Sequence, residues 1–168
     1  MGVPTWAAAQ VLTASDVNTW FVPLAVIKSA DTSRTSTTSL TADPHLTLSV
    51  AASATYQVDV VLLYKGPSGA GFFQWDFDIP ASAVFVNVAS YMNSSGNATV
   101  QYNSAGVTTQ WANTEGTGGS TDDAVRIGGT LAVSSTSGTF DLKWAQHASN
   151  GVATSLLSNS TLSARRIA

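Results

Sequence analysis

One segment constrains the fold of this chain more than any other: ATYQVDVVLLYKG, from Ala54 to Gly66. Every second residue from Tyr56 to Leu62 is aromatic or aliphatic, and the residues between them include Gln57 and Asp59. Successive side chains of a β-strand point to opposite faces of a sheet, so this alternation places one apolar row on one face. The segment therefore predicts a long strand, and its more apolar second half is expected to be buried on both faces.

Short β-rich runs surround this segment. GFFQWDFDIP, from Gly71 to Pro80, places Phe73, Trp75 and Phe77 on one face and follows the long strand across a glycine-rich turn. These two strands therefore predict a hairpin. The other runs are separated by Gly, Asn, Ser and Asp, and they span Leu24–Ser29, His45–Val50, Ala83–Tyr91, Ala98–Tyr102, Val107–Trp111, Ala124–Val133, Gly138–His147 and Ser160–Ala168.

Two polar stretches are expected to separate the first of these strands. Asp43-Pro44 predicts a turn just before His45, and the Thr- and Ser-rich tract from Asp31 to Leu40 predicts a polar edge or loop. About eight to ten short strands remain, each able to bury one face. The chain is therefore expected to be all-β, with two packed antiparallel sheets.

A segment with a helical pattern precedes the strands. In VLTASDVNTWF, from Val11 to Phe21, Thr13 can cap a short helix and Asp16 lies in its first turn, while a proline soon after ends it. So short a helix is not stable unless its apolar side packs on something, either its own β domain or another protein. We therefore expect a docking arm over residues 1–23 and a β domain over residues 24–168. The expected docking residues are apolar or aromatic: Trp6, Leu12, Val17, Trp20 and Phe21.

The composition narrows the classes of function. Only 10% of residues are charged, against roughly 25% in a typical soluble domain, while 44% are hydrophobic and about a quarter are Ser or Thr. The surface is therefore expected to be mostly hydroxyl and amide, with little charge to keep identical copies apart. A formal net charge of -3 provides no basic footprint for nucleic acid. Because Asp16, Asn18 and Pro23 interrupt the apolar N-terminal stretch, we expect neither a signal peptide nor a membrane span, and folding in a cytosol.

Few residues fall in patterns typical of catalysis or metal binding. Cysteine is absent, and His45 and His147 lie far apart in the sequence, so no metal-ligand cluster is expected. Asp76 and Asp78 share one strand face about 7 Å apart and could act as a carboxylate pair, but a solvated strand face is the preferred interpretation. The pair Asp122-Asp123 could bind a hard cation, yet no spaced ligand series of a calcium loop follows it.

Motifs for a serine nucleophile or for phosphate binding are not found, since the chain has neither G-x-S-x-G nor G-x-x-x-x-G-K-[ST]. We therefore expect a non-enzymatic protein without catalytic residues, metal or cofactor. Trp111 is the aromatic residue that could contact a glycan, because it adjoins the long polar loop from Ala112 to Asp123. Arg165 and Arg166 either pair with carboxylates of a neighbouring subunit or belong to a solvated terminus.

Two resemblances go beyond these patterns. PTWAAAQVLTASDVNTWFVPLAV, from Pro4 to Val26, resembles the opening of small virion proteins of phages that infect actinobacteria, in which an LTA-x-D-x-N segment and an aromatic residue precede a β domain. TYQVDVVLLYKG, GTFDLKWAQHAS and STLSARRIA are similar in order and spacing to strands of trimeric jelly rolls of the tumour-necrosis-factor and complement-globular-head type. The long strand begins with Ala54-Thr55-Tyr56 where that family has Gly-x-Tyr. The residues in matching places of the last two strands are Gly138, Trp144, Gln146, Ser160 and Leu162.

These resemblances imply a jelly-roll β-sandwich that forms a homotrimer and docks on phage capsid or tail proteins through its N-terminal segment. The protein would be a capsid decoration protein, a head fibre or a minor tail protein of a virion assembled in the host cytoplasm. An alternative is a glycan-binding module for host attachment with Trp111 at the contact, and a third is a cell-wall hydrolase that uses Asp76 and Asp78. The packing positions implied for the trimer are Tyr56, Trp144, Gln146 and Leu162.

Overall fold

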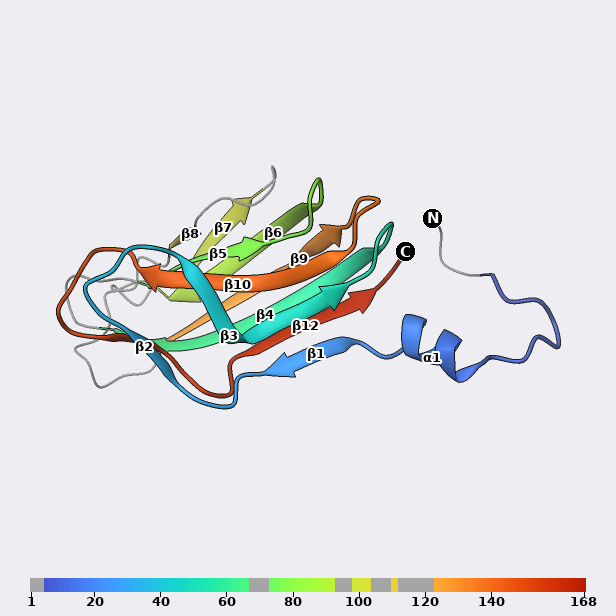
Figure 1. Ribbon diagram of the computed structural model, residues 1–168, viewed down its shortest axis with the longest axis horizontal. Coiled ribbons are helices and arrows are strands. Elements are labelled where there is room, and N and C mark those ends of the chain that lie inside the picture. The colour runs from blue at the N-terminus through green and yellow to red at the C-terminus, as the bar shows by residue number, and fades with distance from the viewer. Residues whose placement is uncertain (1–4, 67–72, 93–97, 104–109, 112–122) are drawn as a thin grey trace.

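The computed structural model describes residues 5–66, 73–92, 98–103, 110–111 and 123–168 (Figure 1). In this part of the chain a short helix, α1 (Ala14–Trp20), precedes two antiparallel sheets that pack face to face. Helix α1 lies at one end of the sandwich, near the C-terminus (Figure 1). No helix of the described residues is long and apolar enough to cross a bilayer.

The strands form one large and one small sheet. The large sheet contains β1 (Leu24–Ile27), β2 (Thr32–Arg34), β4 (Thr55–Lys65), β6 (Val84–Met92), β7 (Ala98–Asn103), β9 (Asp123–Ala132), β11 (Thr154–Leu156) and β12 (Thr161–Arg166). The small sheet contains β3 (Thr41–Val50), β5 (Phe73–Asp78), β8 (Gln110–Trp111) and β10 (Gly138–Gln146). Their orders are β1-β12-β4-β9-β6-β7 and β3-β10-β5-β8, with β11 pairing with both β4 and β2.

The eight strands from β3 through β10 pair in a nested order, as if one long hairpin contained them all. Strand β3 pairs with β10, β4 with β9, β5 with β8, and β6 with β7. Two further pairings, β10 with β5 and β9 with β6, roll this hairpin so that strands alternate between the two sheets along each arm, from β3 to β6 and from β7 to β10. This is a jelly-roll arrangement, so the predicted all-β sandwich with a short N-terminal helix is confirmed.

The long strand forms where the alternation predicted it. In β4 the side chains of Tyr56, Val58, Val60 and Leu62 are all buried in the core. The prediction that its second half is buried on both faces is wrong, because Val61 and Leu63 are only half-buried. These two side chains lie on the outer face of the large sheet, which no third layer of the described chain covers.

Three other local predictions are corrected by the pairing. Strands β4 and β5 do not form a hairpin, because they belong to different sheets. Asp43-Pro44 is not a turn but lies inside β3, where the register with β10 shifts between Asp141 and Lys143. An irregular stretch of this kind tolerates proline, which has no N–H to donate to a ladder. Strand β11 was not expected, whereas β2 lies in the Asp31–Leu40 tract that was predicted as a polar edge or loop. These two strands of three residues each bring the described strands from about ten to twelve.

Aromatic rings from both sheets fill the interior between them. Phe77 of β5 and Phe140 of β10 stack at 4.9 Å between ring centroids, and Phe85 of β6 meets Phe140 edge-on at 5.1 Å. Nearby, Phe73 stacks on Tyr64 of β4 at 4.7 Å. The contacts of Phe85 with Phe140 and of Phe73 with Tyr64 join rings from opposite sheets, so they contribute to holding the two layers together, whereas Phe77 and Phe140 lie in the same sheet.

Candidate functional site

Helix α1 is closed at its start by a complete capping box. The N–H of Asp16 donates to Oγ1 of Thr13 at 3.1 Å, and the N–H of Thr13 donates to Oδ2 of Asp16 at 2.9 Å. The side-chain hydrogen bond from Thr13, followed by the backbone one, lowers the pKa of the Asp16 carboxyl. The helix therefore begins at the residue that the sequence predicted, for the predicted reason.

This helix buries none of its own residues. Among the predicted docking residues, Phe21 exposes 58% of its surface and Leu12 exposes 46%. Trp6 and Val17 are exposed as well, and so is the neighbouring Val22. The apolar side of the N-terminal segment thus faces outward, which is unusual for an ordered amphipathic element.

Trp20, the fifth predicted docking residue, is only half-exposed because it contacts the end of the same chain. The guanidinium of Arg166, at the end of β12, lies over its indole ring at 4.5 Å from the ring centroid. Between this segment and the sandwich is an open hollow of about 270 Å³, bordered by Val22 on one side and Tyr56 and Ala164 on the other. The helix is therefore attached to the β domain by few contacts.

The four residues predicted for trimer packing lie inside a single chain. Tyr56, Trp144, Gln146 and Leu162 are all buried within the sandwich without a neighbouring subunit. Gln146 is satisfied internally, since its Nε2 donates to the carbonyl of Val152 at 2.8 Å and its Oε1 accepts from the N–H of Asn150 at 3.2 Å. Any subunit contact must therefore be made by other side chains that reach the surface.

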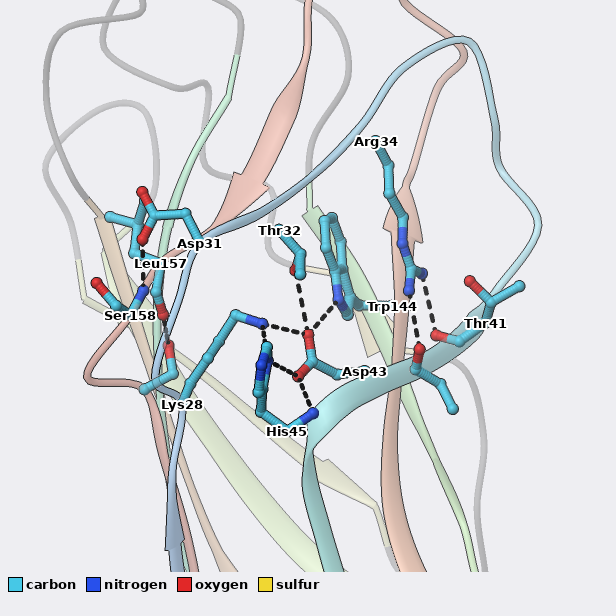
Figure 2. A network of polar contacts seen from close by, with 12 residues as sticks. Lys28, Asp31, Thr32, Arg34, Thr41, Asp43, His45, Trp144, Leu157 and Ser158 are labelled. Atoms are coloured by element: carbon cyan, nitrogen blue, oxygen red, sulfur yellow. Dashed lines mark hydrogen bonds and ion pairs between the residues drawn. The ribbon is translucent and has the colours of Figure 1, made fainter.

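A polar network that the sequence did not suggest lies between the two sheets (Figure 2). Lys28 follows β1 of the large sheet, and Asp43 lies in β3 of the small sheet. The Lys28 Nζ is 2.7 Å from Oδ2 of Asp43, and both side chains are completely buried. The indole N–H of Trp144 donates to the same oxygen at 3.1 Å, and the hydroxyl of Thr32 donates to it at 3.2 Å.

Further contacts complete this network. The other oxygen of Asp43 accepts the N–H of His45 at 3.0 Å, and His45 Nδ1 is 3.2 Å from Lys28 Nζ. Arg34 lies over the Trp144 ring at 4.1 Å and donates to the carbonyls of Thr41 and Ala42 (Figure 2). With every oxygen of Asp43 occupied and no solvent contact, the arrangement is suited to fixing two strands together and not to binding a substrate.

Burial by itself would raise the pKa of the Asp43 carboxyl. The hydrogen bonds from Lys28 and from the His45 amide, together with the Lys28 charge and the Trp144 N–H, outweigh that effect and lower the pKa. Asp43 is therefore a buried carboxylate. The sequence signal for it was its proline neighbour, which was interpreted as marking a turn.

The residues considered for catalysis are engaged within the chain. Asp78 accepts from Nζ of Lys143 at 2.6 Å, and Asp76 accepts the N–H of Phe77 at 2.8 Å. Both arginines near the C-terminus have a partner within the chain, since one N–H of Arg165 donates to Oε1 of Gln57 at 2.8 Å and Arg166 contacts Trp20.

The remaining candidates are only partly described. The backbone of Trp111 pairs with Gln74 of β5, while its side chain and residues 112–122, including Asp122, lie outside the described residues. Within the described ranges, no three His, Asp or Glu side chains gather in a way that could hold a metal ion.

Comparison with known proteins assigns no family. No protein-family model matches the chain, and no curated protein does. Solved structures of the VP2 protein of infectious bursal disease virus were found. The identity is 10% and the TM-score 0.21 for a mutant from T=1 particles, and they are 7% and 0.21 for a subviral particle. The chain spans 45% and 46% of those proteins, which cover 98% and 100% of it. A likeness this weak assigns neither a family nor a function.

Proposed function

We propose that this chain is a non-enzymatic structural protein of a bacteriophage particle, which docks on the capsid or tail through its N-terminal segment and forms a trimer. The role is that of a decoration protein, a head fibre or a minor tail protein. The resemblance of residues 4–26 to actinobacteriophage virion proteins and the jelly-roll topology support this proposal.

The exposed apolar side of the N-terminal segment is the observation that carries the proposal. A helix of seven residues is not stable on its own in water, and α1 buries none of its residues in the β domain. Leu12, Val17 and Phe21 are exposed together on this one segment. An exposed apolar surface of this kind is typical of a site that contacts another protein, and proteins of a larger particle would be that partner.

The docking role can be tested with the full chain. We expect the double variant Leu12→Ser/Phe21→Ser to lose most of its co-sedimentation with phage particles that lack the protein. The reason is that the two substitutions remove apolar side chains that the particle would bury in the proposed contact. Val152→Ser, at an exposed residue of the β domain, is the matched control and should bind as the unaltered chain does. Equal binding of the double variant and the control would remove the docking role.

The trimer rests on the family resemblance and on the low surface charge, since few like charges would oppose self-association. Light scattering of the purified protein should give about three times the chain mass of 17.3 kDa. A monomer over the whole concentration range would exclude the trimer while leaving the docking role to its own test.

A further inference from the structure

Two adjacent glycines in the middle of β9 have different environments. A Cβ on Gly129 would lie 2.4 Å from the carbonyl oxygen of Val86 and 2.8 Å from the ring of Phe85. Glycine at this inward-facing position is therefore required by packing inside the sandwich. On Gly128, which faces outward, a Cβ would meet no atom within 4 Å, and its backbone is not left-handed.

Nothing in the described part of the chain explains glycine at position 128. Strand β9 is central, with β4 on one side and β6 on the other, and a β-branched residue would suit an open position there. Glycine inside a strand often marks the place where a ligand or another backbone approaches closely. Gly128 therefore leaves the outer face of β9 open to close approach by an external group.

The space above Gly128 is an open hollow of about 660 Å³ on the outer face of the large sheet. Planar or hydroxyl-bearing side chains make up much of its lining, namely Gln57, Asp59, Arg126, Thr130, Ser163 and Arg165. Pro23 and Ile167 add apolar surface to it. Two guanidinium groups thus face the hollow against one carboxylate. A ligand with a negative charge and several hydrogen-bonding groups matches this lining.

These side chains are held in position by each other. Arg126 donates to both carboxylate oxygens of Asp59, at 3.2 and 3.0 Å, and these contacts raise the pKa of Arg126. Arg165 donates to Gln57 at 2.8 Å. Each guanidinium keeps further N–H groups for a ligand, because it has five donors in a fixed plane.

An exposed aromatic ring lies on the same face and in the same register row. Gly128 pairs with Val88 of β6, and Val88 pairs with Tyr102 of β7. Tyr102 therefore lies two strand spacings from Gly128, or about 10 Å. Its side chain exposes 68% of its surface. The ring is open to solvent and lies beyond β6 from the hollow, where its apolar face is free to pack against a flat ligand ring.

We propose that the outer face of the large sheet binds an oligosaccharide that carries a carboxylate. An acidic sugar ring lies flat over Gly128, with its carboxylate toward Arg165 and Arg126 and its hydroxyls toward Asp59 and Gln57. A sugar farther along the chain stacks on Tyr102. This site is separate from Trp111 and does not depend on the proposed docking role.

The test is a calorimetric titration of the full-length protein, with oligogalacturonate as the acidic probe and maltohexaose as the neutral one. We expect saturable binding of the acidic probe and at least tenfold weaker binding of the neutral one. Gly128→Val should abolish binding because its side chain occupies the place where the sugar ring lies over residue 128, and Arg165→Gln and Tyr102→Ala should each weaken it about tenfold.

Gly151→Val is the matched control, because a Cβ there also meets no atom within 4 Å and the residue does not line the hollow. Thermal melts would show that each variant is folded. If no acidic oligosaccharide on an array of uronic- and sialic-acid-containing glycans binds, or if Gly128→Val binds as tightly as the control, the proposal is wrong. A change in solution mass caused only by Gly128→Val would also overturn it, because a second copy would then be the occupant.

Discussion

Lys28 and Asp43 form an ion pair of 2.7 Å in which neither side chain reaches solvent. The pair joins the end of β1 in the large sheet to β3 in the small sheet. Burying two charges has a high desolvation cost, so such a pair adds little net stability compared with an apolar pair, but it strongly penalises any arrangement that separates the charges. Its role is therefore to specify how the edges of the two sheets meet.

This interpretation predicts a strongly non-additive double-mutant cycle. Lys28→Met should lower the free energy of unfolding by about 3–5 kcal/mol, because it leaves the Asp43 carboxylate buried without a counter-charge. The double variant Lys28→Met/Asp43→Leu should recover much of that loss. Urea denaturation of the single and double variants measures both values, and a double variant less stable than Lys28→Met would contradict the interpretation.

The same pair predicts a dependence of stability on pH. The pKa of Asp43 is lower in the folded protein than its ordinary value of 3.8, so its contribution is complete above that value and is lost as the pH falls below it. The free energy of unfolding should therefore decrease more steeply below about pH 4 in the unaltered chain than in the Lys28→Met/Asp43→Leu variant. The exposed Asp16 and Asp31, whose pKa values are also lowered, are present in both proteins and cancel in this comparison.

The contact between Trp20 and Arg166 predicts that the helix can detach without unfolding the β domain. Arg166→Gln removes the cation over the indole ring, an interaction of about 0.5–1 kcal/mol at an exposed site. Hydrogen exchange should become faster in residues 14–20 while the midpoint of urea unfolding stays within error. A matching loss of global stability would mean that α1 is an integral part of the fold.

The two glycines of β9 predict opposite results for the same substitution. Gly129→Ala should destabilise the protein by about 1–3 kcal/mol, because a Cβ there overlaps a carbonyl and an aromatic ring. Gly128→Ala should leave stability unchanged or raise it slightly, because the added methyl group meets nothing and glycine is a poor strand residue. Thermal unfolding of the two variants distinguishes these outcomes, and equal effects would contradict the assigned facing of β9.

Local patterns predicted the elements well where one physical cause dominates. The alternation around Val58 and Val60 predicted β4, and Thr13 with Asp16 predicted the start of α1, because each depends only on neighbours in sequence. The hairpin between β4 and β5 was predicted wrongly because a short connection suggests adjacent strands. In the rolled arrangement the chain crosses to the other sheet at this point.

The candidate sites were less accessible to sequence analysis. The sequence predicted that Phe21 and Leu12 take part in docking, but only the structure shows that they are exposed and not packed on the β domain. The hollow over Gly128 requires residues of β4, β9 and β12 to meet. Arg165 and Gln57 are 108 positions apart and become partners only when their strands pair. No spacing within the sequence signals such a contact.

The all-β class, the positions of most strands and the capped helix follow from local sequence patterns, because alternation, turn residues and capping act over a few residues. The tertiary structure alone decided which strands pair, that Asp43 lies inside a strand beside Lys28, and that Trp144 and Leu162 belong to the core of one chain. The physical reason is that strand pairing and charge burial depend on segments far apart in the sequence. Their free energies are fixed only when the two sheets close on each other.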